Sequence, residues 1–332
     1  MKIGSARATI LGAVLLAASL PVATAPAAAQ TEPRRILVTL ARASSEPLTA
    51  VELDLLIAKK PAEVTRVYQP QERPVQLGLV ITDEAGRIDQ SLPALAKFLR
   101  SLPAGSEVMV AYQRGGSLEM VQTFTADLEK AAGKMRAPTG SLFTGSGNLG
   151  QTIQDALASF PRGGTLRQQI LYIGEAAAGP DPYNDPPLNR AIAAAQTRGI
   201  SVWVIRVALT SQGPSAPRRI AEQTQVSGPT PNRIWGPDSG ASPPLVPSTS
   251  VEAQAPTGLS LKRLAQETGG QAFALGVHPP EALYLDELRA LLDRQYLVEF
   301  TPPTDKNGQP LTGKLTMAVR GRKGVRLLYP AR

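Results

Sequence analysis

Apolar residues follow two different periods along the chain. Between residues 75 and 208, short apolar runs alternate with segments in which apolar residues recur every three or four positions. These patterns predict strands and amphipathic helices, respectively. We predict strands over residues 75–81, 107–112, 118–124, 169–173 and 200–208, and helices over residues 91–102, 128–135, 149–160 and 188–197. This alternation predicts an α/β fold with a doubly wound, mainly parallel sheet of the Rossmann-like kind, covered by helices on both faces.

Both ends of the chain carry β-type patterns. Near the N-terminus the predicted strands are residues 35–41, 53–57 and 63–68, and near the C-terminus they are residues 295–301, 314–320 and 325–329. A short helix that stops at Gly269, an edge strand over residues 271–275 and a helix over residues 280–293 precede the second set. Three short strands seldom form a stable unit alone. We therefore expect the two sets to pack together as an accessory β-unit.

The first residues resemble a secretory signal peptide. Lys2 and Arg7 precede an apolar segment over residues 8–22, and small residues occupy positions 27–29. An uncleaved membrane anchor is the alternative, but the segment is short and rich in alanine for crossing a bilayer. We expect a signal peptide over residues 1–29 and an exported protein, periplasmic or secreted, with no membrane span in the mature chain.

The pattern also predicts how the mature chain is divided. The expected parts are an N-terminal β segment (30–74), an α/β domain (75–293) and a C-terminal β segment (294–332). Residues 209–257 are rich in Pro, Ser, Gly and Thr and have little apolar periodicity, so we expect a flexible insertion. Trp235 lies in this insertion. It is a candidate anchor for a partner, or it packs the loop back onto its own domain.

Composition excludes several functional classes. The formal net charge is +8, but the basic residues are scattered and aromatic residues are only 5% of the chain, so nucleic acid is not an expected partner. The chain has no cysteine, which excludes disulfides, thiolate metal sites and a cysteine nucleophile. Its single histidine, His278, lies beside two prolines in a predicted connector, a poor setting for a catalytic triad. We expect no cofactor.

The loop that begins at Asp83 is the first candidate binding site. It follows the apolar strand over residues 75–81, and the carboxyl ends of parallel strands are where α/β sheets bind their ligands. The loop also contains Arg87. Asn148 is expected to cap the helix over residues 149–160, and the amide groups of that helix start could reach the same place.

The order of elements resembles the von Willebrand factor A domain, in particular the bacterial exported proteins described as von Willebrand factor A-related. The most specific matches are Leu-Lys-Arg-Leu-Ala-Gln-Glu-Thr-Gly-Gly-Gln-Ala-Phe at residues 261–273 and Gln-Tyr-Leu-Val-Glu-Phe-Thr-Pro at residues 295–302. Residues 48–67 and 74–87 also match, so the resemblance covers most of the mature chain except the insertion. It implies a von Willebrand factor A-like fold and a role in binding a protein ligand.

The family binds such ligands through a metal-ion-dependent adhesion site. That site has an Asp-x-Ser-x-Ser loop, a Thr from a second loop and an Asp after a later strand, and these oxygen ligands hold Mg²⁺ or a similar cation. The corresponding residues of this chain are Asp83, Ala85, Arg87, Asn148 and Gly174, with Glu175 beside the last. Because most of the oxygen ligands are replaced, the resemblance implies a degenerate site, and we expect no metal ion there.

Two interpretations of the altered loop remain open. In the first the site is vestigial, Arg87 is solvated and Asp83 braces the loop. In the second Arg87 takes the place of the metal, either by binding a carboxylate of the partner or by pairing with Asp83 or Glu175.

The chain lacks a Gly-x-Ser-x-Gly motif, a phosphate-binding loop and a carboxylate pair with a catalytic spacing. We therefore expect a non-catalytic module for protein–protein interaction, adhesion-like or scaffolding, which binds an unidentified protein without metal. The alternatives are a structural subunit of a cell-envelope assembly, a divalent-metal-dependent adhesion protein, and a hydrolase that uses Asp83, Glu175 or a serine of the insertion. The sequence does not predict the oligomeric state.

Overall fold

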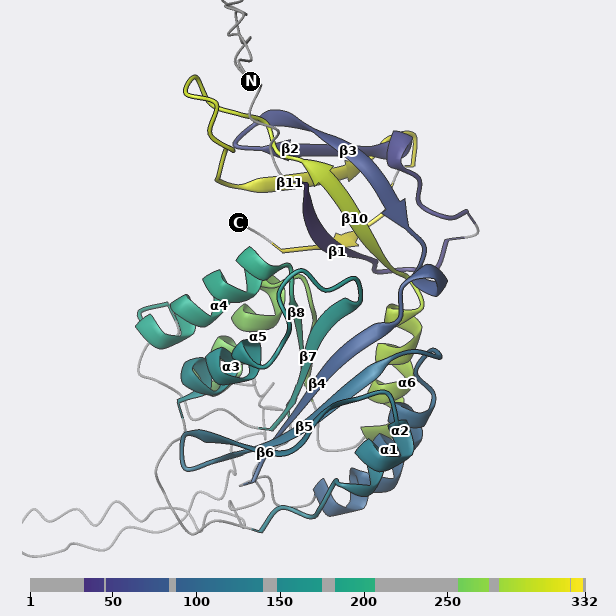
Figure 1. Cartoon of the computed structure of the whole chain (residues 1–332), viewed down its shortest axis with the longest axis vertical. Coiled ribbons are helices and arrows are strands. Elements are labelled where there is room, and N and C mark those ends of the chain that lie inside the picture. The colour runs from purple at the N-terminus through teal and green to yellow at the C-terminus, as the bar shows by residue number, and fades with distance from the viewer. Residues whose placement is uncertain are drawn as a thin grey trace, which may run out of the picture.

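Two six-stranded sheets organise the chain (Figure 1). The computed structural model describes residues 33–44, 46–83, 88–139, 148–174, 183–206, 256–274, 281–322 and 324–330. The signal peptide, nearly all of the insertion, and the residues Arg87, Glu175, Trp235 and His278 lie outside these ranges. The hypotheses about these parts of the chain therefore stay predictions.

The α/β domain is built on the second sheet. Its strands are β4 (Val75–Thr82), β5 (Glu107–Arg114), β6 (Ser117–Thr125), β7 (Arg167–Ile173), β8 (Ser201–Arg206) and β9 (Ala272–Ala274), in the order β6-β5-β4-β7-β8-β9. All neighbours run parallel except β5 and β6. These two form a hairpin whose turn uses Gly115 and Gly116, both with positive φ. The predicted mainly parallel α/β fold is confirmed.

Helices cover both faces of this sheet (Figure 1). One face packs against α1 (Leu92–Arg100), α2 (Leu128–Gly133) and α6 (Glu281–Leu292), and the other against α3 (Leu149–Ala158), α4 (Pro186–Arg198) and α5 (Pro256–Glu267). Because both faces are covered, all eight residues of β4 are buried, which explains its continuous apolar run. Helix α5 begins at Pro256, so it includes the last two residues of the predicted insertion; proline is favoured in the first turn of a helix.

The accessory β-unit forms from both chain ends, as predicted. Its strands are β1 (Arg34–Leu40), β2 (Leu53–Ile57), β3 (Lys60–Tyr68), β10 (Gln295–Thr301), β11 (Leu315–Val319) and β12 (Leu327–Leu328), in the order β11-β2-β3-β10-β1-β12. All of its strand pairs are antiparallel. The C-terminal β10 lies between the N-terminal β1 and β3, so neither set forms this sheet alone. Its apolar side chains make a separate core.

The β-unit packs at the amino ends of the parallel strands (Figure 1). Arg167, at the start of β7, is 1% exposed and donates hydrogen bonds to the carbonyls of Arg73, Leu292 and Gln295. These carbonyls belong to the segments by which the chain leaves and re-enters the β-unit. The opposite, carboxyl edge of the sheet, where β4 ends at Asp83, therefore faces away from the β-unit.

Gly199 lies at a close approach between the two units. It ends α4 with φ of 67°, and a Cβ atom there would lie 2.6 Å from the carbonyl oxygen of Arg35 in β1. We expect Gly199→Ala to lower the free energy of unfolding by about 2–3 kcal/mol, because left-handed strain adds to a backbone clash. Gly308→Ala is the matched control, since Gly308 has φ of 74° and nothing within 4 Å of the added atom. If urea denaturation shows the same loss of unfolding free energy in both variants, the close approach at Gly199 is contradicted.

Candidate functional site

Asp83 is buried at the carboxyl end of β4. Its side chain has no exposed area, and its backbone N–H donates to the carbonyl of Gln113 at 2.9 Å. This bond continues the pairing of β4 with β5 by one residue, so the two strand ends fix the position of the carboxylate. A buried carboxylate is costly unless polar groups surround it.

Those polar groups come from Arg136 and Thr139, which follow α2. Oδ1 of Asp83 accepts hydrogen bonds from Nη1 of Arg136 at 2.7 Å and from the backbone N–H of Thr139 at 2.9 Å. Oδ2 accepts from the hydroxyl of Thr139 at 2.7 Å, and Nη2 of Arg136 is 3.5 Å away. Both carboxylate oxygens are therefore occupied by donors, one of them a guanidinium.

Tyr112 of β5 holds Arg136 in this position. The guanidinium carbon of Arg136 lies 4.1 Å from the centre of the tyrosine ring, a cation–π contact. The Tyr112 hydroxyl also donates to the Arg136 carbonyl and accepts from the Arg136 backbone N–H, both at 2.7 Å. The arginine is thus fixed at both its side chain and its backbone.

A second, more exposed pair of charges borders the first. Glu119 of β6 lies 3.5 Å from Nη2 of Arg136 and 4.0 Å from Nη1 of Arg114. Nε of Arg114 lies 3.9 Å from Oδ2 of Asp83, and the Arg114 side chain is 52% exposed. We call these four residues the charge cluster: Asp83, Glu119, Arg114 and Arg136. The charge cluster therefore has a buried carboxylate and a solvent-facing cationic side.

The surroundings set the ionisation of the cluster. Burial by itself raises the pKa of Asp83, but the hydrogen bonds from Arg136 and Thr139 outweigh it, so this pKa lies below its ordinary value of 3.8. The hydrogen bond to Asp83 raises the pKa of Arg136. Burial raises the pKa of the Tyr112 hydroxyl. At neutral pH the charge cluster therefore contains an ionised Asp83 and a charged Arg136, and the neighbouring Tyr112 is protonated.

These residues do not fit a divalent cation at Asp83. An ion there needs free oxygen ligands, and both oxygens of Asp83 already accept hydrogen bonds. The guanidinium of Arg136 lies against the carboxylate, where a metal would have to displace it. The parts of the chain that the structure describes also contain no group of three or more His, Cys, Asp or Glu side chains arranged to hold a metal.

The other predicted site positions are only partly described. Asn148 caps α3, with its side-chain oxygen accepting from the backbone N–H of Gln151 at 3.1 Å. Gly174, at the position of the family's last Asp, has φ of 156°, and a Cβ atom there would lie 2.1 Å from Cγ2 of Thr82. A larger residue at position 174 would therefore have to move the end of β4. Arg87, Glu175 and Trp235 lie outside the described residues.

Sequence reasoning missed Arg136 and Thr139. Both lie in an irregular segment after α2 that has no apolar period. The only local signal is an arginine and a hydroxyl residue in a connection between two helices that pack on opposite faces of the sheet. The described part of this connection, up to Thr139, lies against Asp83.

A scan against protein-family models gives no match, and a search of curated proteins gives none. Solved structures similar in fold include an aerotolerance-related membrane protein from Bacteroides fragilis carrying multiple mutations to serine (TM-score 0.42, 14% identity, covering 66% of this chain and 98% of that chain). They also include the conserved hypothetical protein BatB from Bacteroides thetaiotaomicron (TM-score 0.40, 15% identity, 65% and 98%) and the VWA domain of SpRpn10 (TM-score 0.32, 13% identity, 40% and 75%).

Proposed function

We propose that this chain is an exported, non-catalytic module that binds a protein partner at the carboxyl edge of its α/β sheet, without a metal ion. The observation that carries the proposal is the pairing of buried Asp83 with Arg136 at 2.7 Å. The resemblance implies a ligand-binding cation at this place, and here the protein supplies a permanent cation of its own. A guanidinium can bind a carboxylate of a partner with two parallel hydrogen bonds.

The geometry of the charge cluster supports this role. Arg136 uses its Nη1 atom mainly for Asp83, while its side chain remains 31% exposed. Arg114 lies beside it and is more exposed. Glu119 balances part of this charge at distances of 3.5 Å and 4.0 Å, which are long for ion pairs and leave it replaceable by a partner's carboxylate.

Export and the absence of catalysis are part of the same proposal. The pattern of residues 1–29 supports export. None of the helices in the described ranges is long and apolar enough to cross a membrane. Cell fractionation, with N-terminal sequencing of the recovered protein, tests this part: a cytoplasmic, uncleaved chain would contradict it.

Metal independence is tested by calorimetric titration of the mature protein with Mg²⁺, Mn²⁺ and Ca²⁺, together with thermal melts in metal and in chelator. We expect no binding heat and no change in melting temperature, because Arg136 occupies the carboxylate. A divalent ion that binds in the micromolar range and raises the melting temperature would restore metal-dependent adhesion as the leading function.

Partner binding at the same edge is tested by photo-crosslinking in envelope fractions with the variants Arg114→Gln and Arg87→Ala. We expect each variant to capture less of the partner than the wild type does. Arg100→Gln is the control, because Arg100 is 48% exposed and pairs with Glu129 between α1 and α2, away from Asp83. Capture unchanged in the first two variants would contradict a cationic binding edge.

A further inference from the structure

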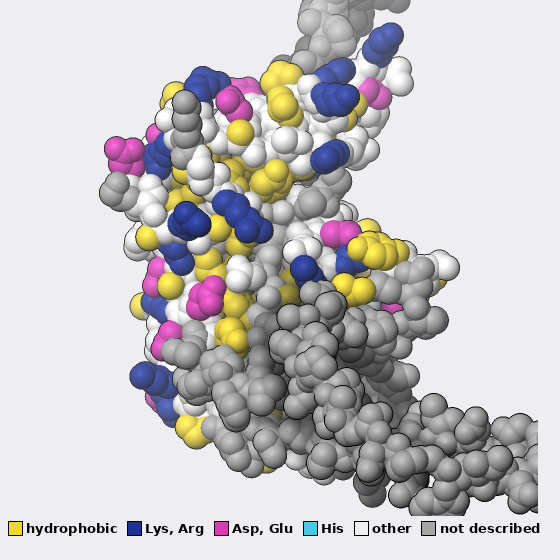
Figure 2. Space-filling view, turned by 180° about the vertical axis from the view of Figure 1, so that it is seen from behind, with side chains coloured by type: hydrophobic (Ala, Val, Ile, Leu, Met, Phe, Trp, Pro, Cys, Tyr) yellow, Lys and Arg dark blue, Asp and Glu magenta, His cyan; other side chains and the backbone are white. Residues whose placement is uncertain are grey.

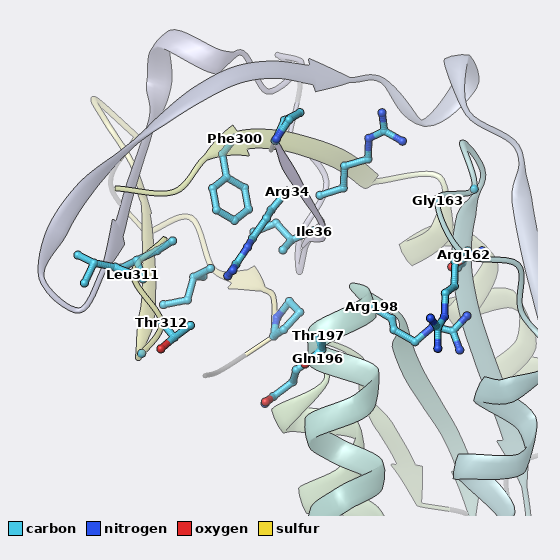
Figure 3. Close-up of a pocket in the computed structure, with 18 of the residues that line it drawn as sticks. Arg34, Ile36, Arg162, Gly163, Gln196, Thr197, Arg198, Phe300, Leu311 and Thr312 are labelled. Carbon is cyan, nitrogen blue, oxygen red and sulfur yellow. The ribbon is translucent and has the colours of Figure 1, made fainter. Parts of the chain in front are cut away.

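A cleft of about 910 Å³ separates the β-unit from the α/β domain (Figure 3). Its upper wall comes from β1, β10 and residues 311–315, and its lower wall from residues 161–164 and the end of α4. Figure 2 shows the surface hollowed between the two units, with Lys and Arg side chains on both sides of the hollow. The cleft lies at the amino ends of the parallel strands, so it is separate from the Asp83 edge.

Positive charge lines this cleft on both walls. Arg34 and Arg35 come from β1, Arg162 from the turn before β7 and Arg198 from the last residue of α4, and no Asp or Glu is among the described lining residues. Arg35 is paired with Glu299 at 3.0 Å. Within the described ranges, the other three arginines form no ion pair with a carboxylate. The cleft therefore carries positive charge that the described residues around it do not fully balance.

Arg162 and Arg198 lie side by side on the lower wall (Figure 3). The guanidinium of Arg198 donates to the carbonyls of Leu157 and Phe160, at the end of α3, which hold it in place. Burial lowers the pKa of Arg198, and the charge of Arg162 lowers it further. Two like charges held together in this way repel each other, and an anion bound between them would relieve that repulsion.

The upper wall adds apolar surface. Ile36, Phe300 and Leu311 line it, and Arg34 points into the space between this wall and the end of α4 (Figure 3). A single small anion would contact one wall and leave the apolar residues without a partner. The combination instead fits an extended ligand that carries several carboxylates and an apolar group, in a space near the upper size of ordinary ligand sites.

We propose that this cleft binds an acidic peptide segment of another protein. Carboxylate side chains of the segment pair with Arg34 on one wall and with Arg162 and Arg198 on the other, and an apolar side chain between them contacts Phe300. This site is additional to the proposed binding edge at Asp83, and either site can exist without the other.

The test is calorimetric titration of the mature protein with the peptide Glu-Ala-Glu-Leu-Glu-Ala-Glu and with the same peptide carrying Gln in place of Glu. We expect only the acidic peptide to bind, and its affinity to fall as salt is raised. In the double variant Arg34→Gln and Arg162→Gln the affinity should fall by at least about tenfold. These two arginines make no ion pair in the described structure, so the variant should melt like the wild type.

Arg100→Gln is the control for the loss of one positive charge outside the cleft, and inorganic phosphate is the competing probe. The proposal is overturned if the acidic peptide fails to bind at millimolar concentration, if the Gln peptide binds equally well, or if the double variant binds as tightly as Arg100→Gln. It is also overturned if phosphate alone displaces the peptide at equal concentration, because the cleft would then be a site for small anions.

Discussion

Arg167→Ala is expected to lower the free energy of unfolding by about 3 kcal/mol. Arg167 donates to the carbonyl oxygens of Arg73 at 2.7 Å, Leu292 at 2.6 Å and Gln295 at 3.1 Å. Alanine would leave these acceptors without a donor, at about 1–3 kcal/mol for each that stays buried. Removing a buried charge offsets part of that loss, since burial lowers the pKa of Arg167 to about 10. Urea denaturation at pH 7 measures the difference.

Two further variants separate the possible causes. Arg100→Ala removes an exposed ion pair, so it should cost less than about 1 kcal/mol. Arg167→Lys keeps the charge, but a single ammonium group cannot reach three carbonyls in the way that a planar guanidinium does, so we expect most of the loss to remain. If Arg167→Ala changes the free energy of unfolding by less than about 1 kcal/mol, Arg167 does not hold the α/β domain and the β-unit together.

The shape of the unfolding transition gives a second test of whether Arg167 couples the two units. The three carbonyls belong to the segments that connect the α/β domain with the β-unit. Loss of their common donor is expected to weaken the coupling between the core of the β-unit and the two cores of the α/β domain. We therefore expect a broader transition, or two transitions, in the variant, where the wild type unfolds in one.

Periodicity in the sequence was enough to predict most of the α/β domain. Apart from Gln76 and Thr82, β4 has no polar side chain, because helices cover both faces of the sheet, and the hairpin of β5 and β6 is marked by Gly115-Gly116. The pairing of the two chain ends was inferred from stability, since three strands alone bury too little surface. The strand order was not predictable, because the position of β10 between β1 and β3 depends on contacts more than 200 residues apart in sequence.

The candidate site was predictable only in part. Asp83 was found because it ends a buried parallel strand, a local feature. Its partners were not found, because Arg136 is 53 residues away and reaches Asp83 only through its contacts with Tyr112. One of the two interpretations drawn from the sequence is that Arg87 takes the place of the metal, and it stays a prediction because Arg87 lies outside the described residues. In the described residues the arginine against Asp83 is Arg136, while Arg87 stays a candidate for the partner-facing side.

Asp83→Asn is expected to lower the free energy of unfolding at pH 7 by about 2–4 kcal/mol. Both oxygens of Asp83 accept hydrogen bonds, and Oδ1 accepts two from N–H donors that cannot reverse their direction. The asparagine amide must therefore lie at the Oδ2 position, where, among the described residues, the Thr139 hydroxyl can turn to accept from it. Even in that orientation, Arg136 loses its buried counter-charge.

The same variant has a defined dependence on pH. Because the folded-state pKa of Asp83 lies below 3.8, its ionised form stabilises the folded state above that pH. This stability is lost as the pH falls from about 5 through the folded-state pKa, since a protonated Asp83 resembles the neutral asparagine. The difference in the free energy of unfolding between the wild type and Asp83→Asn should therefore shrink between pH 5 and pH 3. The decrease is at most about 1.4 kcal/mol for each unit by which the folded-state pKa of Asp83 lies below its unfolded-state pKa.

Asp54→Asn is the control for this pH dependence. Asp54 pairs with Arg320 on the surface, with side chains 46% and 68% exposed, so its loss should cost less than about 1 kcal/mol. If the loss of unfolding free energy in Asp83→Asn stays constant down to pH 3, the charge of the Asp83 carboxylate does not contribute to stability. Arg136 would then not be the charge partner that stands in place of a metal, and the proposed metal-free binding edge would lose its electrostatic basis.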